Sequence, residues 1–333
     1  MTPVTAFVDG MRRVAAAPWV LAGMFVMTFL LALPLAIALR ESLGAHLGAS
    51  LIAAAVADGV DYDWWQEFSS QASGLAATFT PTIIGFAAVL ENISDVLDGE
   101  TPIAPLAGAL AAYLCVWTFL LGGIVDRYAR QRRTRAHGFF SAAGVFFFRF
   151  LRLAVIAGIL YWLLFHYVHA WLFDKWFANA TRDLDSERTA FAWRLLMYGI
   201  FGALLAAVNL TMSYAKVRMV VEDRRSALGA LLAALRFCWR RKRAIAGLYG
   251  LNVLLFLAVI AVWAGVAPGA GSAGPSMWVR FIAGQLYILA RLAIEMQFVA
   301  SQTSLFQSSL AHARYTATPA PAWPESPAAA IIP

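Results

Sequence analysis

The sequence predicts an all-α, polytopic membrane protein with a single helical domain over residues 1–314. Hydrophobic residues occupy 61% of the 333 positions and charged residues only 14%, and the mean hydropathy is +0.68. Soluble globular chains carry roughly 25% charged residues. Six apolar segments are also long enough to cross a bilayer, which takes about 20 residues in a helix. Composition and segment length therefore both exclude a soluble globular protein.

The six segments do not alternate between apolar and polar residues, so they predict helices rather than the strands of a barrel. Residues 43–99, between the first two segments, predict a helical periplasmic cap. Residues 315–333 hold five prolines and predict a disordered cytoplasmic tail. The predicted spans are 18–39, 105–124, 151–172, 195–215, 244–266 and 277–300.

The charges of the connecting loops predict the orientation. Residues 126–152 hold seven Arg against one Asp, and residues 216–243 hold nine Lys or Arg against two acids. Residues 40–103 instead hold one Arg against nine acids. Basic loops stay in the cytoplasm. The pattern predicts a multi-pass protein of a bacterial inner membrane with both termini in the cytoplasm.

An internal repeat is indicated by sliding the sequence against itself by 91 residues. Helices 2 and 3 then align with helices 4 and 5 without a gap, and charged and glycine positions coincide. A fainter copy starts near Phe7 and Arg13. We therefore expect three parallel two-helix repeats, each opened by a basic pre-helix. The coinciding pairs are Arg127 with Arg218, Arg133 with Arg224, Gly138 with Gly229, Arg149 with Arg240, and Arg152 with Arg243.

Two of the expected pre-helices, residues 138–150 and 226–237, are apolar but adjoin arginines. Such segments are expected to lie in the cytoplasmic interface and to bend into the membrane, with their arginines near lipid phosphates. No Gly-rich phosphate loop accompanies these charges, so membrane lipids rather than nucleotides or nucleic acids are the expected partner. The predicted headgroup contacts are Arg149, Arg152, Arg240, Arg241 and Arg243.

The segment ALRFCWRRKRAIAGLYGLNVLLF, residues 234–256, carries a family resemblance. It is similar to the membrane region fused to some glycerophosphodiester phosphodiesterases, in which an Arg-bearing amphipathic segment precedes each long helix. The resemblance implies a helical membrane domain over most of the chain. It does not imply hydrolase activity, because the catalytic barrel of those enzymes is absent from this sequence.

The sixth predicted span contains Arg291 and Glu295, which are four positions apart and share a helix face. Charge inside a membrane is costly and by default signals function. One interpretation is an inward-facing polar site for a substrate or for proton coupling. The other is an ion pair that locks this helix against its neighbours through Asn209 or Asn252. The pattern of residues favours neither interpretation. Under both, these four residues form the candidate intramembrane site.

The stretch DYDWWQEF, residues 61–68, is the candidate outer site. Asp61, Asp63 and Glu67 could act as acid and base or hold a cation, but no calcium-loop spacing occurs. The favoured interpretation is structural. Asp63 and Gln66 form a capping-box pattern that would start a helix at Trp64, and both tryptophans would lie in the aromatic belt.

Two further segments near the outer face were considered. His166 and His169 are three apart and could bind a metal or haem, but interfacial polar residues are the favoured interpretation. Residues 80–99 predict a helix that Thr80 caps and Gly99 ends.

No cofactor and no metal are expected. The predicted function is a non-catalytic transporter, or a scaffold that packs against another membrane protein, with anionic lipid bound at its cytoplasmic face. The alternative is a lipid-headgroup enzyme that uses the outer carboxylates.

Overall fold

The computed structural model describes residues 1–48, 50–58, 61–80, 87–100, 104–131, 134–182, 184–267 and 275–312. In these ranges the regular structure is helical, without a strand. Six helices are long and apolar enough to cross a membrane, and each predicted span lies within one of them. The prediction of a polytopic helical membrane protein is thus confirmed. The helices are α2 (Pro18–Leu47), α6 (Ala104–Arg130), α7 with its continuation (Ala136–Thr181), α9 (Glu187–Val221), α11 (Lys242–Val266) and α12 (Pro275–His312).

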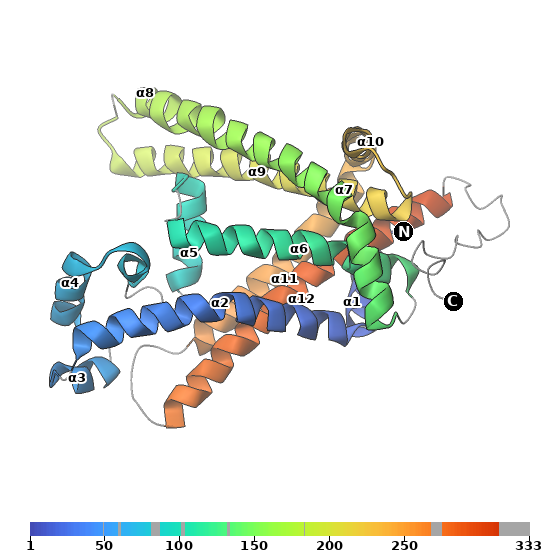
Figure 1. Cartoon of the computed structure of the whole chain (residues 1–333). Helices are drawn as coiled ribbons and strands as arrows, with labels where there is room; N and C mark the ends of the chain where they lie inside the picture. The colour runs from blue at the N-terminus through green and yellow to red at the C-terminus, as the bar shows by residue number, and fades with distance from the viewer. Residues whose placement is uncertain are drawn as a thin grey trace.

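The long helices run between two ends of the molecule that carry different short helices (Figure 1). We call the first the basic end, formed by α1 (Pro3–Ala15), α10 (Ala227–Arg240) and the α6–α7 and α9–α10 connections. We call the second the cap end, formed by α3 (Ile52–Asp58), α4 (Tyr62–Gln71) and α5 (Ala87–Asp98). The N-terminus and the last turns of α12 both lie at the basic end, as an even number of crossings requires.

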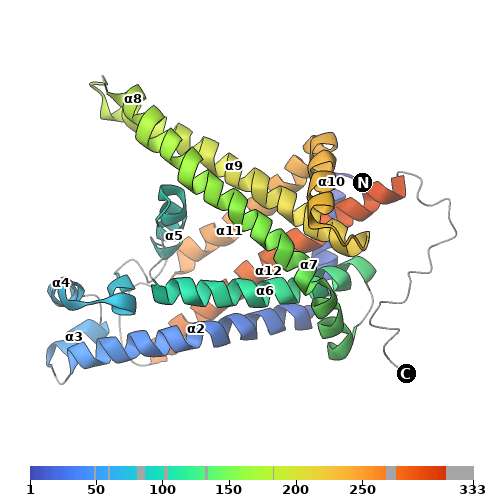
Figure 2. The same ribbon diagram turned by 45° about the horizontal axis from the view of Figure 1, so that its top comes forward.

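The main hydrophobic core lies toward the basic end. It joins α1, α6, α7, α9, α10, α11 and α12 through residues such as Leu121, Phe150, Tyr214 and Phe306. Toward the cap end the pair α7 and α9 diverges from α2 and α6, and α5 lies between the two groups (Figure 2).

Short helices precede two of the long ones at the basic end, and a third long helix, α7, bends there instead. Helix α1 ends before Pro18, whose ring favours the first turn of the next helix. Helix α10 ends at Arg240, and the backbone of the next residue, Arg241 (φ −115°, ψ 25°), leaves helical geometry before α11 begins. Helix α7 is helical without interruption from Ala136 to Leu163, but its ribbon changes direction on the way (Figure 1). The three-fold repeat itself stays a prediction.

The start of α4 corrects one prediction. The Asp61 carboxylate, not Asp63, caps the helix: its Oδ1 accepts from the Trp64 backbone N–H at 2.8 Å, and the helix begins at Tyr62. Asp61 has the extended backbone (φ −81°, ψ 117°) that an N-cap residue adopts. Asp63 falls inside the first turn, where its backbone is already helical, so it cannot act as the cap.

Trp64 also lies elsewhere than predicted. It is buried, and its ring packs against Phe68, Phe79 and His46. Its Nε1–H donates to His46 Nδ1 at 3.2 Å. These rings form a small core that fastens α4 to the last turn of α2, so placing Trp64 in an aromatic belt was wrong. Burying a large ring against three others is more favourable than leaving it at a water boundary.

The predicted helix over residues 80–99 is seen in part as α5. Residues 81–86, which directly follow the predicted cap Thr80, lie outside the described residues, as does the predicted tail 315–333. Gly99 follows α5 with φ +75°, a left-handed conformation that favours glycine. The prediction that Gly99 ends this helix is confirmed.

A charged cavity between the long helices

A cavity of about 420 Å³ lies between α6, α9, α11 and α12. Its charged, amide and serine side chains come from two helices. Asn209, Ser213 and Lys216 have the spacing i, i+4, i+7 along α9, which places them on one face. Arg291, Glu295 and Gln302 occupy one face of α12 by the same rule. Aromatic residues of α6 and α11, including Trp117 and Tyr249, complete the wall. We call this space the charged cavity.

The three charges in the charged cavity are not balanced. Arg291 is close enough to Glu295 to attract it electrostatically, and its guanidinium lies 6.0 Å from the centre of the Tyr287 ring. No N–O contact within 4.0 Å joins Arg291 to Glu295, although the side chains of both are described. Lys216 is partly buried in the wall of the cavity and has no hydrogen bond or ion pair with any described residue. Two cations therefore face one carboxylate.

The four residues of the predicted intramembrane site do not all meet. Arg291, Glu295 and Asn209 line the charged cavity together. Asn252 does not: it is fully buried, and its Nδ2 donates to the Leu248 carbonyl at 2.9 Å and to Ser301 Oγ at 3.2 Å. Asn252 therefore ties α11 to α12, while the other three residues face a space that can hold a ligand.

Lys216, Ser213 and Gln302 were missed by the sequence analysis. Lys216 was counted as a charge of the basic loop 216–243, because it stands one residue beyond the predicted fourth span. Helix α9 in fact continues to Val221, so Lys216 is still helical. The spacing of Asn209, Ser213 and Lys216 is the signal that could have placed them on one face.

A second cavity of about 360 Å³ adjoins the first toward α5. Asn209 and Tyr249 line both spaces. The rest of its wall comes from α5, α7 with its continuation, and α9, through apolar side chains such as Val96, Phe165 and Leu205. Among the described residues, no charged one lines it. We call this space the apolar cavity.

Polar contacts hold α5 against the helices at the cap end. The Asp98 carboxylate accepts from the Tyr198 hydroxyl, from Arg194 Nη2 at 3.3 Å and from Ser94 Oγ at 2.9 Å. The Tyr198 hydrogen bond is the main cause that holds the pKa of Asp98 below its usual value. The Nε2 of His169 lies 3.0 Å from the Leu97 carbonyl, which accepts its hydrogen bond. Helix α5 is thus held beside the apolar cavity and contributes Val96 to its wall.

The outer candidates are separate from these cavities. His169 contacts α5, whereas His166 stacks on Trp162 at 5.2 Å, so the two imidazoles have different partners. The Asp61 carboxylate accepts the hydrogen bond that caps α4, and Asp63 and Glu67 are exposed on that helix. Among the described residues, no three His, Cys, Asp or Glu side chains are grouped to hold a metal ion.

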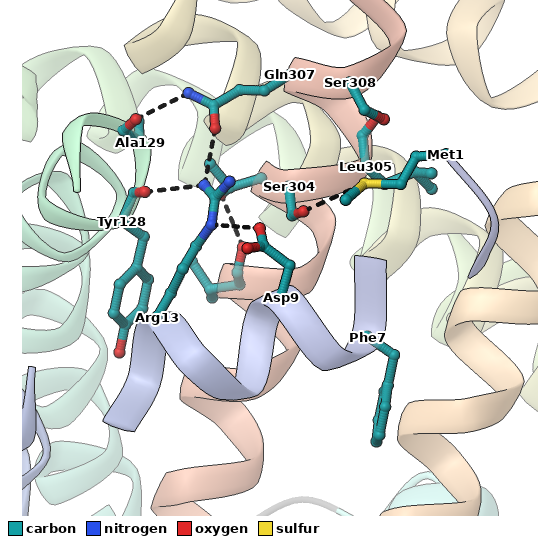
Figure 3. A network of polar contacts seen from close by, with 12 residues as sticks. Met1, Phe7, Asp9, Arg13, Tyr128, Ala129, Ser304, Leu305, Gln307 and Ser308 are labelled. Carbon is teal, nitrogen blue, oxygen red and sulfur yellow. Dashed lines mark hydrogen bonds and ion pairs between the residues drawn. The ribbon is translucent and has the colours of Figure 1, made fainter. Parts of the chain in front are cut away.

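The basic end is joined by hydrogen bonds centred on Arg13 (Figure 3). Arg13 is buried. Its Nε donates to Asp9 Oδ2 at 2.8 Å, and its Nη1 donates to the Tyr128 carbonyl at 2.9 Å and to Gln307 Oε1 at 2.7 Å. The Nε2 of Gln307 in turn donates to the Ala129 carbonyl at 2.9 Å. Because α6 ends at Arg130, the Tyr128 and Ala129 carbonyls have no donor within their own helix. Their hydrogen bonds come from α1 and α12 instead.

The predicted lipid contacts fall into two groups. Arg149 forms an ion pair with Asp223 and lies 5.2 Å from the centre of the Phe146 ring, so its charge is satisfied within the protein. The other four are exposed at the basic end, beside an exposed apolar stripe on α10. The exposed arginines are Arg152, Arg240, Arg241 and Arg243, and the stripe consists of Leu228, Leu232, Leu235 and Trp239.

The chain was compared with protein families, curated proteins and solved structures, and no family model, curated protein or solved structure matches it. Composition and fold assign it to the integral membrane proteins with six apolar helices.

Proposed function

We propose that this protein is a transporter of a bacterial inner membrane whose substrate binds in the charged cavity. The observation that carries the proposal is the position of Lys216, Arg291 and Glu295 in one cavity among apolar helices. Charged side chains are expensive in that setting and mark substrate or ion pathways. A volume of about 420 Å³ falls in the range of small-molecule sites.

In the proposed orientation the basic end faces the cytoplasm and the cap end faces the periplasm, by the positive-inside rule. The charged and apolar cavities then lie in series between the two sides, and α5 is the outer closure. The three expected parallel repeats also suit a transporter, since repeats are common in transporter folds. A catalytic role for Asp61, Asp63 and Glu67 has less support, because Asp61 is engaged by the α4 cap.

Cysteine accessibility tests the proposal. In a background with Cys115→Ser and Cys238→Ser, we compare Ser213→Cys with Thr211→Cys on the same helix. Ser213 lines the charged cavity, whereas Thr211 does not and is rotated by roughly 200° from it. Both residues are small, hydroxylated and at nearly equal depth, so the pair isolates the effect of the cavity.

A charged thiol reagent that cannot cross the bilayer is expected to label Ser213→Cys and to leave Thr211→Cys unmodified. Protection of both cysteines would mean a closed, dry bundle and would reject transport. Equal labelling of both would mean that water reaches this helix from every side, which would reject a defined pathway. Measuring labelling from each face of oriented vesicles then tells which end is open.

A further inference from the structure

We propose that the two adjoining cavities bind an anion that carries an apolar chain, with its head in the charged cavity and its chain in the apolar cavity. The inference rests on the proposed transport function and names the substrate class for that site. Its chemical class is an acidic headgroup, carboxylate or phosphate, on a long acyl chain. It is carried by three observations on the described residues: an unbalanced cation, an uncharged neighbouring space, and the residues that join the two.

The head position follows from the charges. Glu295 attracts Arg291, so the carboxylate partly compensates one of the two cations. Lys216 is partly buried where it lines the charged cavity, and it has no such partner among the described residues. A cation that lines a space among apolar helices without a contacting counter-charge attracts an anion to that space. An anionic headgroup in the charged cavity would supply that counter-charge, and Ser213 and Gln302 line the same space and offer hydrogen-bond donors.

The chain position follows from the neighbouring space. The lining of the apolar cavity includes Val96, Phe165, Leu205 and Ala206, with the Tyr161 ring beside them, and none of the described residues that line it is charged. A small inorganic anion would leave this space unused. An acyl chain would instead pack against these apolar side chains through van der Waals contacts. Two adjoining spaces of about 420 and 360 Å³, one charged and one not, match the two halves of an amphiphile.

Asn209 and Tyr249 stand where the two cavities adjoin, since each lines both. The amide of Asn209 and the hydroxyl of Tyr249 suit the polar linkage of a headgroup to its chain, because both groups donate and accept hydrogen bonds. The lining thus changes from charged, through neutral polar, to apolar along α9, from Lys216 past Asn209 to Leu205. That order is the polarity gradient of a single-chain acidic lipid.

The experiment uses the full chain in a non-ionic detergent and follows protection of Ser213→Cys from the thiol reagent. Three probes separate charge from chain: oleate has both, oleyl alcohol has the chain alone, and acetate has the charge alone. Oleate is expected to protect the thiol, while oleyl alcohol and acetate at equal concentration are not. Oleoyl lysophosphatidate, compared with oleate, tells whether a phosphate or a carboxylate head binds more tightly.

Charge variants on α9 complete the test. Lys216→Gln is expected to weaken oleate binding at least about tenfold, the loss of one charge-assisted interaction. Lys216→Arg should restore most of it. Arg188→Gln is the matched control, because it removes one exposed cation from the far end of the same helix. Its oleate affinity should equal that of the parent.

Each contrary result has a distinct meaning. Equal protection by acetate and oleate would show that the acyl chain does not contribute to binding. Equal protection by oleyl alcohol and oleate would show that the negative charge does not contribute. No protection by oleate, or unchanged affinity in Lys216→Gln, would overturn the substrate class as a whole. In all these cases Ser213→Cys still reacts in the absence of probe, so transport through the cavity survives. Failure of Ser213→Cys to react without any probe would instead reject the proposed function itself.

Discussion

The Arg13 guanidinium donates a 2.7 Å hydrogen bond to the side-chain oxygen of Gln307, although 294 positions separate the two residues. The contact joins α1, the first helix, to α12, the last described one. Because the same two side chains also donate to the last carbonyls of α6, one node connects three helices at the basic end. The main core lies at this end too, so the basic end is where the bundle is held together.

Removing the Arg13 side chain should destabilise the protein. Arg13→Ala leaves Asp9, Gln307 and the Tyr128 carbonyl without their donor in a buried setting. Breaking a buried ion pair by deleting one partner costs about 3 kcal/mol or more. We expect a clearly lower midpoint of thermal unfolding in detergent. Arg12→Ala, one position earlier and exposed, is the control and should unfold like the parent. Equal midpoints for the two variants would contradict the role of the node.

The contact of α1 with α12 should also be sensitive to one methyl group. A Cβ added to Gly10 would lie 2.8 Å from the backbone of Ser301, closer than real Cβ contacts allow. Ala is otherwise favoured over Gly in helices by about 1 kcal/mol. We therefore expect Gly10→Ala to lower the unfolding midpoint. Gly23→Ala in α2, where the new Cβ meets nothing within 4 Å, should leave it unchanged or raise it slightly. An increase in both variants would show that α1 does not pack as described.

Docking of α5 should depend on pH through Asp98. Its pKa is lowered when α5 is docked, chiefly by the Tyr198 hydrogen bond, so docking favours the charged carboxylate. A lowered pKa means that the stabilisation is fully present above the ordinary value of 3.8 and is lost as the pH falls through the lowered value. We expect Asp98→Asn to speed amide hydrogen exchange in α5 at neutral pH, with a ratio to the parent that approaches one in acid.

The ratio of the variant to the parent cancels the intrinsic pH dependence of exchange, so only the Asp98 contribution remains. Asp95→Asn, on the same helix, is the matched control, because the Asp95 carboxylate is partly exposed and makes no hydrogen bond or ion pair with any described residue; it should give a ratio near one at every pH. A ratio for Asp98→Asn that stays constant from neutral to acidic pH would mean that another contact holds α5, with His169 and the Leu97 carbonyl the next candidate.

Anionic lipid should co-purify with the basic end. The exposed apolar stripe of α10 adjoins exposed arginines, a combination that binds anionic membrane surfaces. Native mass spectrometry in a mild detergent should find fewer bound anionic lipids on Arg240→Gln/Arg243→Gln than on the parent. The control Arg182→Gln/Arg188→Gln removes the same charge from the opposite end of the bundle, and its lipid count should be unchanged. Equal loss in both variants would indicate binding to net charge alone.

Composition and segment length were sufficient to predict the membrane class and the six long helices. That prediction succeeds because in lipid each backbone polar group must bond within its own helix, so an apolar run of sufficient length determines the element locally. Loop charges predicted the orientation by an equally local rule, which the structure leaves as a prediction. Helix ends were less certain, as the shift of the α4 cap from Asp63 to Asp61 shows, since neighbouring carboxylates compete for the same backbone N–H groups.

The site was predicted only in part. Arg291 and Glu295 stood out because charge is rare in an apolar run, but Lys216 carried no such signal at the edge of a basic loop. Asn252 and Asn209 look alike in sequence, yet one binds Ser301 and the other lines two cavities. The difference depends on which way each helix is turned against its neighbours.

By itself the sequence determined that the chain forms six membrane-length helices, since hydrophobic length and backbone hydrogen bonding are properties of each segment alone. Only the tertiary structure decided which polar side chains meet: Lys216 with Arg291 across a cavity, and Arg13 with Gln307 in a buried node. Those meetings depend on the packing of helices far apart in the chain, because the positions and rotations of several helices together determine the distance between two side chains.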